Sequence, residues 1–590
     1  MIAIDPICGM PIDTEKAKFK AEVRGGVYYF CNEEHRRNFL EGSKIAYFSM
    51  EIGIESDIPT YSGGLGMLAG DSLSSCADLR IPLIAVTLVS KKGFVRQQIT
   101  EIGYQKEHPD DWDPSMFMRP LPDTVTVRID GRDVKIKSWL HDHKSPAGGL
   151  VPVLLLDTDL GENSSEDRDI TSYLYGGDER YRLKQEIVLG IGGMRMLEAL
   201  NFKIRKYHMN EGHSSFLTLE LMKKNGMDAD RTRDLCIFTT HAPVEAAFDK
   251  FSYDDAHAIL GAEFPQEELK RYAGPDRLNM TLLALNLSKY VNGVTNAHME
   301  YSKMLFPGYH LRAITNGVHP YTWTCQPFRE LFDKYIPGWA NEPELLVRVD
   351  EIPHQEIWNA HINAKKSLID YINEGTQGGM DVNVLTLGFA RRATAYKRAT
   401  LIFSDLNRLR DIDKSGKLQL IFAGKAHPKD EAGKRIIKEI YNYRSQLRGD
   451  IKVVYLENYN MKLAGKLTSG VDVWLNTPLP PNEASGTSGM KAAYNGVMNF
   501  SVLDGWWIEG CIEGVTGWAI GPKPGKPMSE GERRARELKD LYNKLEYLVI
   551  PAFYNNRDAW TYLMRNSIGK IAYYFHSHRM MRRYATEAYL

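Results

Sequence analysis

The stretch VLTLGFARR, residues 384–392, is a continuous apolar run that ends in two arginines. Three further apolar runs follow it, and each also ends in polar residues: LQLIFAGKAHP (418–428), IKVVYLENY (451–459) and VDVWLNT (471–477). Continuous apolar runs of this length are typical of strands buried on both faces of a parallel sheet. Because helix-like segments alternate with these runs, residues 385–475 predict a doubly wound α/β domain.

Similar runs before about residue 320 predict a second domain of the same kind: IAYFSM (45–50), IPLIAVTLVS (81–90) and LCIFTTHAPV (235–244). The predicted fold class is therefore α/β, with two doubly wound domains that face a cleft. Ligands of such domains bind at the carboxyl ends of the strands, so polar residues there are expected to border the cleft. These residues are His241, Arg391, Arg392, Lys425, His427 and Tyr459.

The bulk properties are those of a large globular protein. The chain has 590 residues, a formal net charge of -1 and 43% hydrophobic residues, which suggests two to four domains. The near-neutral charge provides no global attraction for nucleic acid or membrane, and no apolar run approaches the roughly 20 residues that span a bilayer. Six cysteines are too few for a disulfide scaffold, and no secretory signal is visible, so we expect a reducing cytoplasm.

Two motifs lie where the cleft is expected. The first, YSGGLGMLAGDSLSS (Tyr61–Ser75), opens a predicted helix with glycines that let backbone amides approach an anion, although a plain tight turn would use the same residues. The second, GFARRATAYKRA (388–399), sets four cations directly after an apolar strand. A solvated basic face is the alternative, but the position at a strand end favours anion binding.

A third motif, EASGTSGMKAAYNG (483–496), places Lys491 at the start of a predicted helix behind a turn of small residues. A cation is unfavourable at a helix N-terminus, where the backbone dipole attracts anions. A surface lysine is the simplest interpretation of Lys491 taken alone. Beside an anion-binding turn and the arginine cluster, a lysine that forms a Schiff base next to a bound phosphate is a second interpretation.

Together these motifs resemble those of the α-glucan (glycogen, starch or maltodextrin) phosphorylases, a family that uses pyridoxal 5'-phosphate. EASGTSGMKAAYNG is similar to the cofactor-lysine segment of that family, YSGGLGMLAG to its glycine loop and ARRATAYKR to its phosphate-binding segment. FTTHAPVEAAFDKF (238–251) and ITNGVHPYTW (314–323) are similar to its sugar-site segments. The resemblance runs from about Lys44 to near the C-terminus and fits the short prokaryotic members.

The resemblance implies a role for each matching residue. Lys491 would carry pyridoxal 5'-phosphate, and the residues implied to bind the cofactor with it are Thr487, Ser488, Arg391, Tyr459 and Trp323. Those implied for substrate phosphate are Arg392, Lys397 and the Gly64 amide. Those implied for the terminal glucose are His241, Asn316, Tyr396, Glu483, Ser485, Gly486 and the Leu65 backbone. The implied catalytic set is Lys491, Arg392, Lys397, His241 and Glu483.

The implied activity is the reversible phosphorolysis of an α-1,4-glucan or maltooligosaccharide to α-glucose 1-phosphate, with retention of the anomeric configuration. The phosphate of the cofactor would exchange a proton with inorganic phosphate, so the pair of carboxylates that a glycosidase needs is not required. Two adjacent phosphates repel each other, and the basic cluster would offset that repulsion.

Four positions depart from the pattern of the family. Thr394-Ala395 stands where many members have His-Glu, Glu211 where an aspartate is expected, and Gly489 where an asparagine is common. These changes leave acceptor preference open. With the short chain, they lead us to expect that allosteric control is lacking.

The N-terminal segment resembles a YHS domain, on the basis of DPICGM (5–10), VYYFC (27–31) and EEHRRNF (33–39). Cys8, Cys31 and His35 are ligand types that could hold a zinc-like or copper-like ion. Three ligands leave a tetrahedral site incomplete, so a small β-rich module with a buried thiol is an equal alternative.

The predicted organisation is of the GT-B type. A YHS-like metal-binding module is expected at residues 1–42 and an N-terminal Rossmann-like glucan and phosphate domain at 43–318. A C-terminal Rossmann-like pyridoxal phosphate domain is expected at 319–568. For residues 569–590 we expect a helix that packs back across the cleft, with membrane-surface binding as the alternative.

Two other functions stay open beside phosphorolysis. One is glucan synthesis from a nucleotide sugar on the same architecture without pyridoxal phosphate, because fold alone does not separate these activities. The other is a non-catalytic glucan- or metal-sensing protein. Lys491 discriminates between phosphorolysis and synthesis from a nucleotide sugar, because a nucleotide-sugar enzyme has no need of this lysine. The expected partners are the glucan and inorganic phosphate, without nucleic acid or membrane, and the assembly considered is a homodimer.

Overall fold

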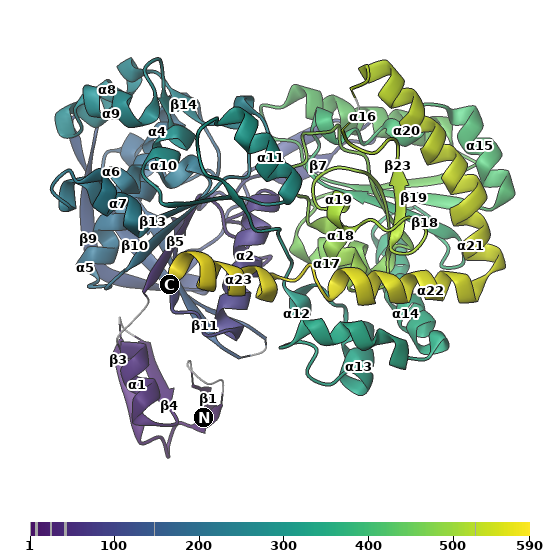
Figure 1. Cartoon of the computed structure of the whole chain (residues 1–590), viewed down its shortest axis with the longest axis horizontal. Coiled ribbons are helices and arrows are strands. Elements are labelled where there is room, and N and C mark those ends of the chain that lie inside the picture. Colours follow the sequence, from purple (N-terminus) through teal and green to yellow (C-terminus); the bar gives the residue numbers. More distant parts are fainter. Residues whose placement is uncertain (1, 6–9, 24–25, 41–43, 147, 526) are drawn as a thin grey trace. The chain divides into compact units, whose positions relative to one another are not determined.

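The computed structural model describes residues 2–5, 10–23, 26–40, 44–146, 148–525 and 527–590. The chain divides into two compact units. Unit 1 comprises Met1–Phe94, Pro109–Thr315 and Met580–Leu590, and unit 2 comprises Val95–His108 and Asn316–Arg579. Figure 1 labels many of the elements of both units.

The sheet of unit 2 has six parallel strands in the order β20-β19-β18-β21-β22-β23. The strands are β18 (Leu385–Ala390), β19 (Leu418–Ala423), β20 (Lys452–Leu456), β21 (Val473–Asn476), β22 (Met498–Val502) and β23 (Gly517–Ile520). Numbered along the chain this order is 3-2-1-4-5-6, that of a doubly wound Rossmann sheet. The first four strands are the predicted apolar runs. The order reverses between β18 and β21, so a ligand is expected outside their carboxyl ends.

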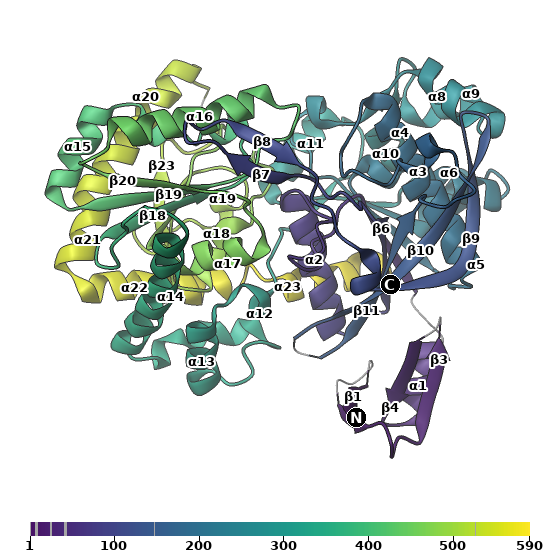
Figure 2. The same cartoon turned by 180° about the vertical axis from the view of Figure 1, so that it is seen from behind.

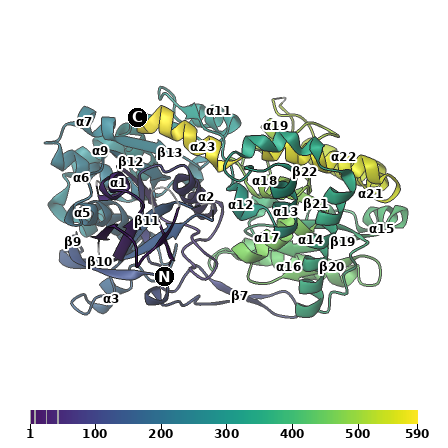
Figure 3. The ribbon, with the colours of Figure 1, turned by 90° about the horizontal axis from the view of Figure 1, so that it is seen from below.

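Helices cover both faces of this sheet. They are α12 (Pro320–Trp323), α13 (Gln326–Tyr335), α14 (His354–Gly375), α15 (Leu406–Ser415), α16 (Glu431–Gln446), α17 (Met461–Gly470), α18 (Ser488–Ala493), α19 (Trp507–Gly510), α20 (Glu530–Lys544), α21 (Ile550–Asn555) and α22 (Arg557–Ser567). Leu368 of α14 and Leu467 of α17 share one apolar cluster with Ile421 of β19, and Figure 3 shows these two helices together. On the opposite face, the rings of Phe403 and Phe422 lie 5.4 Å apart.

A hairpin from the first part of the chain completes unit 2. Strands β7 (Arg96–Ile99) and β8 (Gln105–His108) pair antiparallel and lie beside α16 (Figure 2). Gln97 donates to the carbonyl of Gly424 at 2.8 Å, and Lys425 donates to the carbonyl of Val95 at 2.7 Å. These bonds cover the end of β19, so Lys425, which was expected to border the ligand cleft, is engaged in holding the hairpin.

The sheet of unit 1 has nine strands in the order β17-β16-β13-β12-β5-β6-β11-β10-β9. The strands are β5 (Ile45–Ser49), β6 (Leu83–Leu88), β9 (Arg119–Ile129), β10 (Arg132–Lys144), β11 (Leu150–Asp157), β12 (Lys206–Asn210), β13 (Cys236–Thr239), β16 (Tyr290–Gly293) and β17 (Arg312–Ala313). Its seven parallel strands again run 3-2-1-4-5-6-7, extended by antiparallel β10 and β9. Here the order reverses between β5 and β12, which marks a second expected ligand position.

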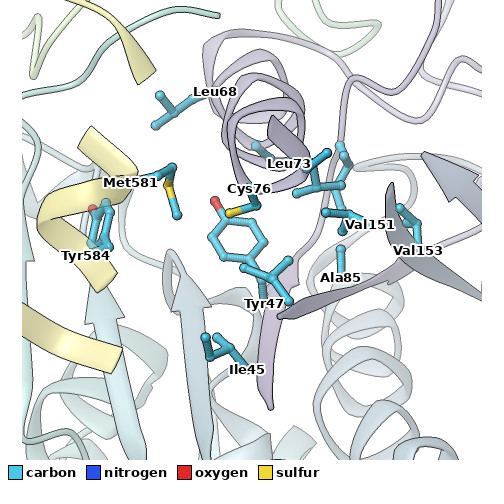
Figure 4. Close-up of a cluster of buried hydrophobic side chains, with 14 of the residues drawn as sticks. Ile45, Tyr47, Leu68, Leu73, Cys76, Ala85, Val151, Val153, Met581 and Tyr584 are labelled. Atoms are coloured by element: carbon cyan, nitrogen blue, oxygen red, sulfur yellow. The ribbon is translucent and has the colours of Figure 1, made fainter. Parts of the chain in front are cut away.

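The core of unit 1 includes the end of the chain. The helices of this unit are α2 (Gly64–Asp78), α3 (Ser165–Arg168), α4 (Glu179–Ile187), α5 (Gly193–Ala199), α6 (Phe216–Lys224), α7 (Ala229–Leu235), α8 (Tyr253–Leu260), α9 (Gln266–Ala273), α10 (Met280–Asn286) and α11 (Asn296–Leu305). Figure 4 shows Met581 and Tyr584, from α23 (Ser577–Tyr584), in one cluster with Tyr47 and Cys76. The Tyr584 hydroxyl also accepts from the Asn292 amide at 2.9 Å. The last residues are therefore built into unit 1.

The N-terminal segment forms two small hairpins and a helix. The hairpins are β1 (Ile2–Ile4) with β2 (Pro11–Asp13) and β3 (Phe19–Val23) with β4 (Gly26–Phe30), and the helix is α1 (Glu33–Leu40). The ring of Phe30 is buried and lies 5.2 Å from that of Phe39. Across the part of the chain that the structure describes, none of the helices combines the length and the apolar character needed to traverse a bilayer.

Candidate active site

The charged side chains predicted for the site in unit 2 cluster where the strand order of its sheet reverses. Arg391 follows β18, and its guanidinium donates to Asn476 at the end of β21. The same guanidinium forms an ion pair with Glu483 at 3.0 Å, and Lys397 pairs with the same carboxylate oxygen at 2.6 Å. Two strands and the following turn thus join two cations and one carboxylate that are distant in sequence.

Glu483 is an ionised group held inside the protein. It is 7% exposed, and burial disfavours its charge, but the neighbouring Arg391 and Lys397 outweigh that effect and hold its pKa below the usual range. Two cations on one carboxylate leave the cluster with a net positive charge, which favours a further anion nearby.

The four cations after β18 divide into three roles. Arg391 and Lys397 hold Glu483. Arg398, with a φ of 49°, pairs with buried Glu537 at 2.6 Å and donates to the Thr477 carbonyl, which makes it structural. Arg392 is exposed and has no hydrogen bond or ion pair with any residue that the structure describes. Its guanidinium is therefore the one of the four that is available to a substrate anion.

Lys491 lies inside unit 2, in contact with an aromatic wall. It is 5% exposed on α18, and its Nζ lies 3.6 Å from the centroid of the Trp323 ring, which excludes the surface interpretation. Thr487 is the N-cap residue of this helix, and the Ser488 hydroxyl accepts from Trp474 Nε1 at 3.0 Å. A buried lysine beside hydroxyls and glycine is suited to a planar aldehyde that carries a phosphate, because the amine can bind it covalently while the helix start receives the anion.

The remaining predicted residues of unit 2 have the following surroundings. Ser485 donates to the carbonyl of Gly486, whose φ of 70° favours glycine, and Tyr459 packs against the core under α17. Tyr396 presents its ring 4.5 Å from Lys397 Nζ. Asn316 is 3% exposed, and its Oδ1 has no hydrogen-bond partner among the described residues, so it can receive a ligand donor.

Gly489, where an asparagine is common in the family that the sequence resembles, stands against filled space. A Cβ at this position would lie 2.2 Å from Asn499 Oδ1 and 2.7 Å from Trp506 Cζ2. Asn499 also donates to the Gly489 carbonyl at 2.9 Å. The side chains of Asn499 and Trp506 thus occupy the space that a side chain at position 489 would take.

A loop after β22, which the sequence analysis missed, supports this turn. The Asp504 carboxylate accepts from the Glu483 amide at 2.9 Å and from the Gly505 amide at 3.0 Å, while Trp506 N–H donates to the Ser485 carbonyl at 2.9 Å. A Cβ on Gly505 would lie 2.2 Å from the Ser485 oxygen, so the close approach needs glycine. The only sequence signal was an Asp-Gly pair after an apolar strand. Burial raises the pKa of Asp504 to about 7.

Changing Asp504 to asparagine is expected to flatten the pH dependence of stability. Because the folded pKa is about 7 and an unfolded aspartate titrates near about 4, the folded state binds the extra proton between these values. The stability from this proton is complete below about pH 4 and is lost as the pH rises through about 7. Thermal melts of wild type and Asp504→Asn between pH 5 and 8 measure the two slopes, and equal slopes would contradict this assignment.

Unit 1 contributes a second set of groups at its own reversal point. Glu51 follows β5, Asn210 ends β12 with Glu211 directly after it, and His241 follows β13. His241 Nε2 lies 2.7 Å from Asn210 Oδ1, and its backbone amide donates to Glu211 at 2.6 Å. Burial lowers the pKa of His241 to about 3 and raises that of Glu211 to about 7. His241 is therefore a neutral imidazole whose Nε2–H donates to Asn210, which leaves Nδ1 as an acceptor.

Gly64 and Leu65 open α2, behind the N-cap residue Gly63, which provides no side-chain cap. A Cβ added at Gly63 or Gly64 would meet no atom within 4 Å, so the backbone there borders open space. Uncapped amides at the start of a long helix are donors for a ligand. Each unit therefore holds a part of the predicted set, at the carboxyl ends of its own strands.

Two of the three predicted ligands of the N-terminal module, Cys31 and His35, lie beside a carboxylate that was not predicted. Cys31 Sγ lies 3.3 Å from His35 Nδ1, and that nitrogen lies 3.0 Å from Oδ2 of Asp5, which is fully buried. One ligand atom from each of the three lies within 4.8 Å of the others. Cys8 lies outside the described residues. Asp5 was not predicted, because a lone aspartate gives no ligand signal in sequence.

Comparisons with known proteins agree with the sequence pattern. The profile of the carbohydrate phosphorylase family matches residues 207–515. The chain is 40% identical to the maltodextrin phosphorylase of Thermococcus litoralis over 591 residues, which cover 92% of this chain and 70% of that protein. It is 35% identical to the glycogen phosphorylase of Aquifex aeolicus (92% and 86% covered) and 34% identical to that of Mycobacterium tuberculosis (92% and 70%).

Proposed function

Because the chain belongs to the carbohydrate phosphorylase family, we propose that it transfers the non-reducing-end glucose of an α-1,4-glucan or maltooligosaccharide to inorganic phosphate. The product is α-glucose 1-phosphate with retained configuration, and the reaction is reversible. The observation that carries the proposal is buried Lys491 on the Trp323 ring, in the turn that begins at Glu483 and its two cations. A glucan- or nucleotide-sugar-binding protein without the cofactor has no need of that lysine.

The residues of unit 2 fit pyridoxal 5'-phosphate. Lys491 would hold it, with Trp323 and Tyr459 as its aromatic walls and Thr487, Ser488 and Arg391 as donors to its phosphate. When bound, the cofactor supplies a phosphate that can exchange a proton with the substrate phosphate. The net positive charge that Arg391 and Lys397 keep after pairing with Glu483 would offset part of the charge that two phosphates bring together.

The protein groups around the substrate then act by binding and orientation. Arg392 grips the attacking phosphate, since its guanidinium is exposed and matches phosphate oxygens bidentately. Gly64 donates its amide to this phosphate. The neutral imidazole of His241 accepts a hydroxyl of the terminal glucose at Nδ1, because Nε2–H is held by Asn210. Other groups proposed for the sugar are Asn316, Tyr396, Glu483, Ser485, Gly486 and the Leu65 backbone.

The two doubly wound sheets support a GT-B type of organisation, and we propose for its parts the boundaries at 42/43, 318/319 and 568/569. We place the enzyme in the cytoplasm, as a homodimer without allosteric control. Release of glucose 1-phosphate from maltooligosaccharides and glycogen, with and without added pyridoxal 5'-phosphate, tests the activity. Synthesis that requires a nucleotide sugar and no phosphate would contradict it.

For the YHS-like module we propose a zinc-like or copper-like ion on Asp5, Cys31 and His35, with Cys8 as a further ligand. A thiolate, an imidazole and a carboxylate are the donors that such ions prefer. Metal analysis of the purified full chain is expected to give bound metal that His35→Ala and Cys31→Ser remove. Cys511→Ser, which alters a thiol of unit 2, should retain it. Equal metal in all variants, or none in wild type, would contradict the site.

A further inference from the structure

Glu51 is a buried carboxylate that the sequence analysis did not select. It follows β5 at the reversal point of the unit 1 sheet and is 3% exposed. Its Oε2 accepts from the backbone amides of Ser62 and Gly63, at 2.6 and 3.1 Å. Its Oε1 accepts from the hydroxyl of Tyr175 at 2.8 Å. A single side chain thus binds two consecutive amides of the glycine loop, residues 61–66.

The glycine loop is tightly packed on the side of Glu51 and open on the other. A Cβ at Gly66 would lie 2.6 Å from Glu51 Oε2 and 2.8 Å from Tyr61 Cβ. The carbonyl of Gly66 also accepts from the Gly53 amide at 2.8 Å. By contrast, a Cβ at Gly63 or Gly64 would meet nothing within 4 Å. The loop is therefore fixed from behind, with its open side at the first amides of α2.

Tyr175 in turn keeps Glu51 in place. Burial, and next the charge of Glu51, raise the pKa of Tyr175, so its hydroxyl keeps its proton and donates. The Arg182 guanidinium lies 4.3 Å from the centre of the Tyr175 ring and bonds to Asp249 at 3.2 Å. The Tyr175 side chain is thus held between the Arg182 guanidinium and the Glu51 carboxylate, to which its hydroxyl donates.

We propose that Glu51 is a positioning residue of the reaction, acting through the glycine loop. By holding the amides of Ser62 and Gly63, it sets the direction of the next two amides, those of Gly64 and Leu65. Hydrogen bonds to an ionised acceptor are roughly twice as strong as neutral ones, which suits a loop that must not shift when a ligand arrives. The inference rests on the proposed function, in which these two amides contact substrate.

The test compares Glu51→Gln, Tyr175→Phe and a control, Glu55→Gln, in the full enzyme with its cofactor. Glu55 is an exposed carboxylate in the same segment. Glutamine keeps the shape of Glu51 but replaces one acceptor oxygen by a donor. We expect Glu51→Gln to lower kcat about 100-fold, with a smaller change in KM for glucan, since a displacement of about 1 Å costs that much. Tyr175→Phe should lower kcat several-fold.

A second readout separates positioning from folding. Hydrogen exchange of the peptide that spans residues 61–66 should be faster in Glu51→Gln than in wild type, whereas thermal melting and cofactor absorbance should stay unchanged. The inference would be overturned if Glu51→Gln had the kcat and the exchange rate of wild type. If Glu51→Gln does not fold, the same result in Tyr175→Phe would overturn it. An inactive wild type would instead overturn the proposed function, and unchanged exchange in the variants would still overturn the role of Glu51.

Discussion

Replacing Lys491 by alanine is expected to lower the rate of phosphorolysis by about four orders of magnitude or more, as loss of a group that acts as a unit with its partners does. In the proposed site the amine holds the cofactor covalently against Trp323, so its removal would take away the second phosphate beside the cations that pair with Glu483. Initial rates of glucose 1-phosphate release at saturating phosphate measure the effect.

The matched control for this variant is Lys184→Ala. Lys184 is also a buried lysine, 7% exposed, but it lies on α4 of unit 1 and pairs with Asp130 at 2.7 Å. Its loss should cost stability and leave the near-ultraviolet absorbance of the cofactor intact. If Lys491→Ala kept more than a tenth of the wild-type rate, covalent cofactor binding at this position would be wrong.

Replacing Arg392 by alanine is expected to raise KM for inorganic phosphate by about 100-fold, with a much smaller effect on KM for glucan. Each contact between a guanidinium and a charged oxygen contributes about 1.5–3 kcal/mol, and Arg392 can form two such bonds. The other cations of the cluster are already engaged with Glu483 or Glu537, so they cannot replace it fully.

Rates measured against phosphate and glucan in turn test this expectation. Arg435→Ala is the control, because Arg435 is an exposed arginine on α16 of the same unit. It should behave as wild type. An unchanged phosphate dependence in Arg392→Ala would place the phosphate site elsewhere, even if the enzyme were otherwise active.

Much of the fold could be predicted from the sequence because buried parallel strands appear in it as continuous apolar runs. The runs that became β18 to β21 and β5, β6 and β13 are apolar on both faces, and short polar ends mark their carboxyl edges. The sequence analysis set the arginine cluster beside the turn 483–496, but it did not predict the ion pair of Arg391 with Glu483, because the order of the strands was not known. Once the strand order is known, each of these residues lies at a point where the order reverses.

The supporting contacts could not be predicted, because they join residues that no local pattern connects. Asp504 lies 21 residues after Glu483 and accepts from its backbone amide, and Glu51 accepts from backbone amides of the glycine loop. A side chain that accepts from backbone amides needs no particular residue type as its partner, so no sequence motif reveals such a contact. The hairpin 95–108 belongs to unit 2 although it lies between segments of unit 1. Hydrophobic periodicity does not predict which unit it joins.

The most direct test of the account is the chemical location of the cofactor. Purified protein is expected to absorb in the near-ultraviolet, and reduction with borohydride should fix this chromophore to one peptide, the one that contains Lys491. An active protein without the chromophore, or a label on any other lysine, would contradict the assignment of the buried lysine and with it the proposed reaction.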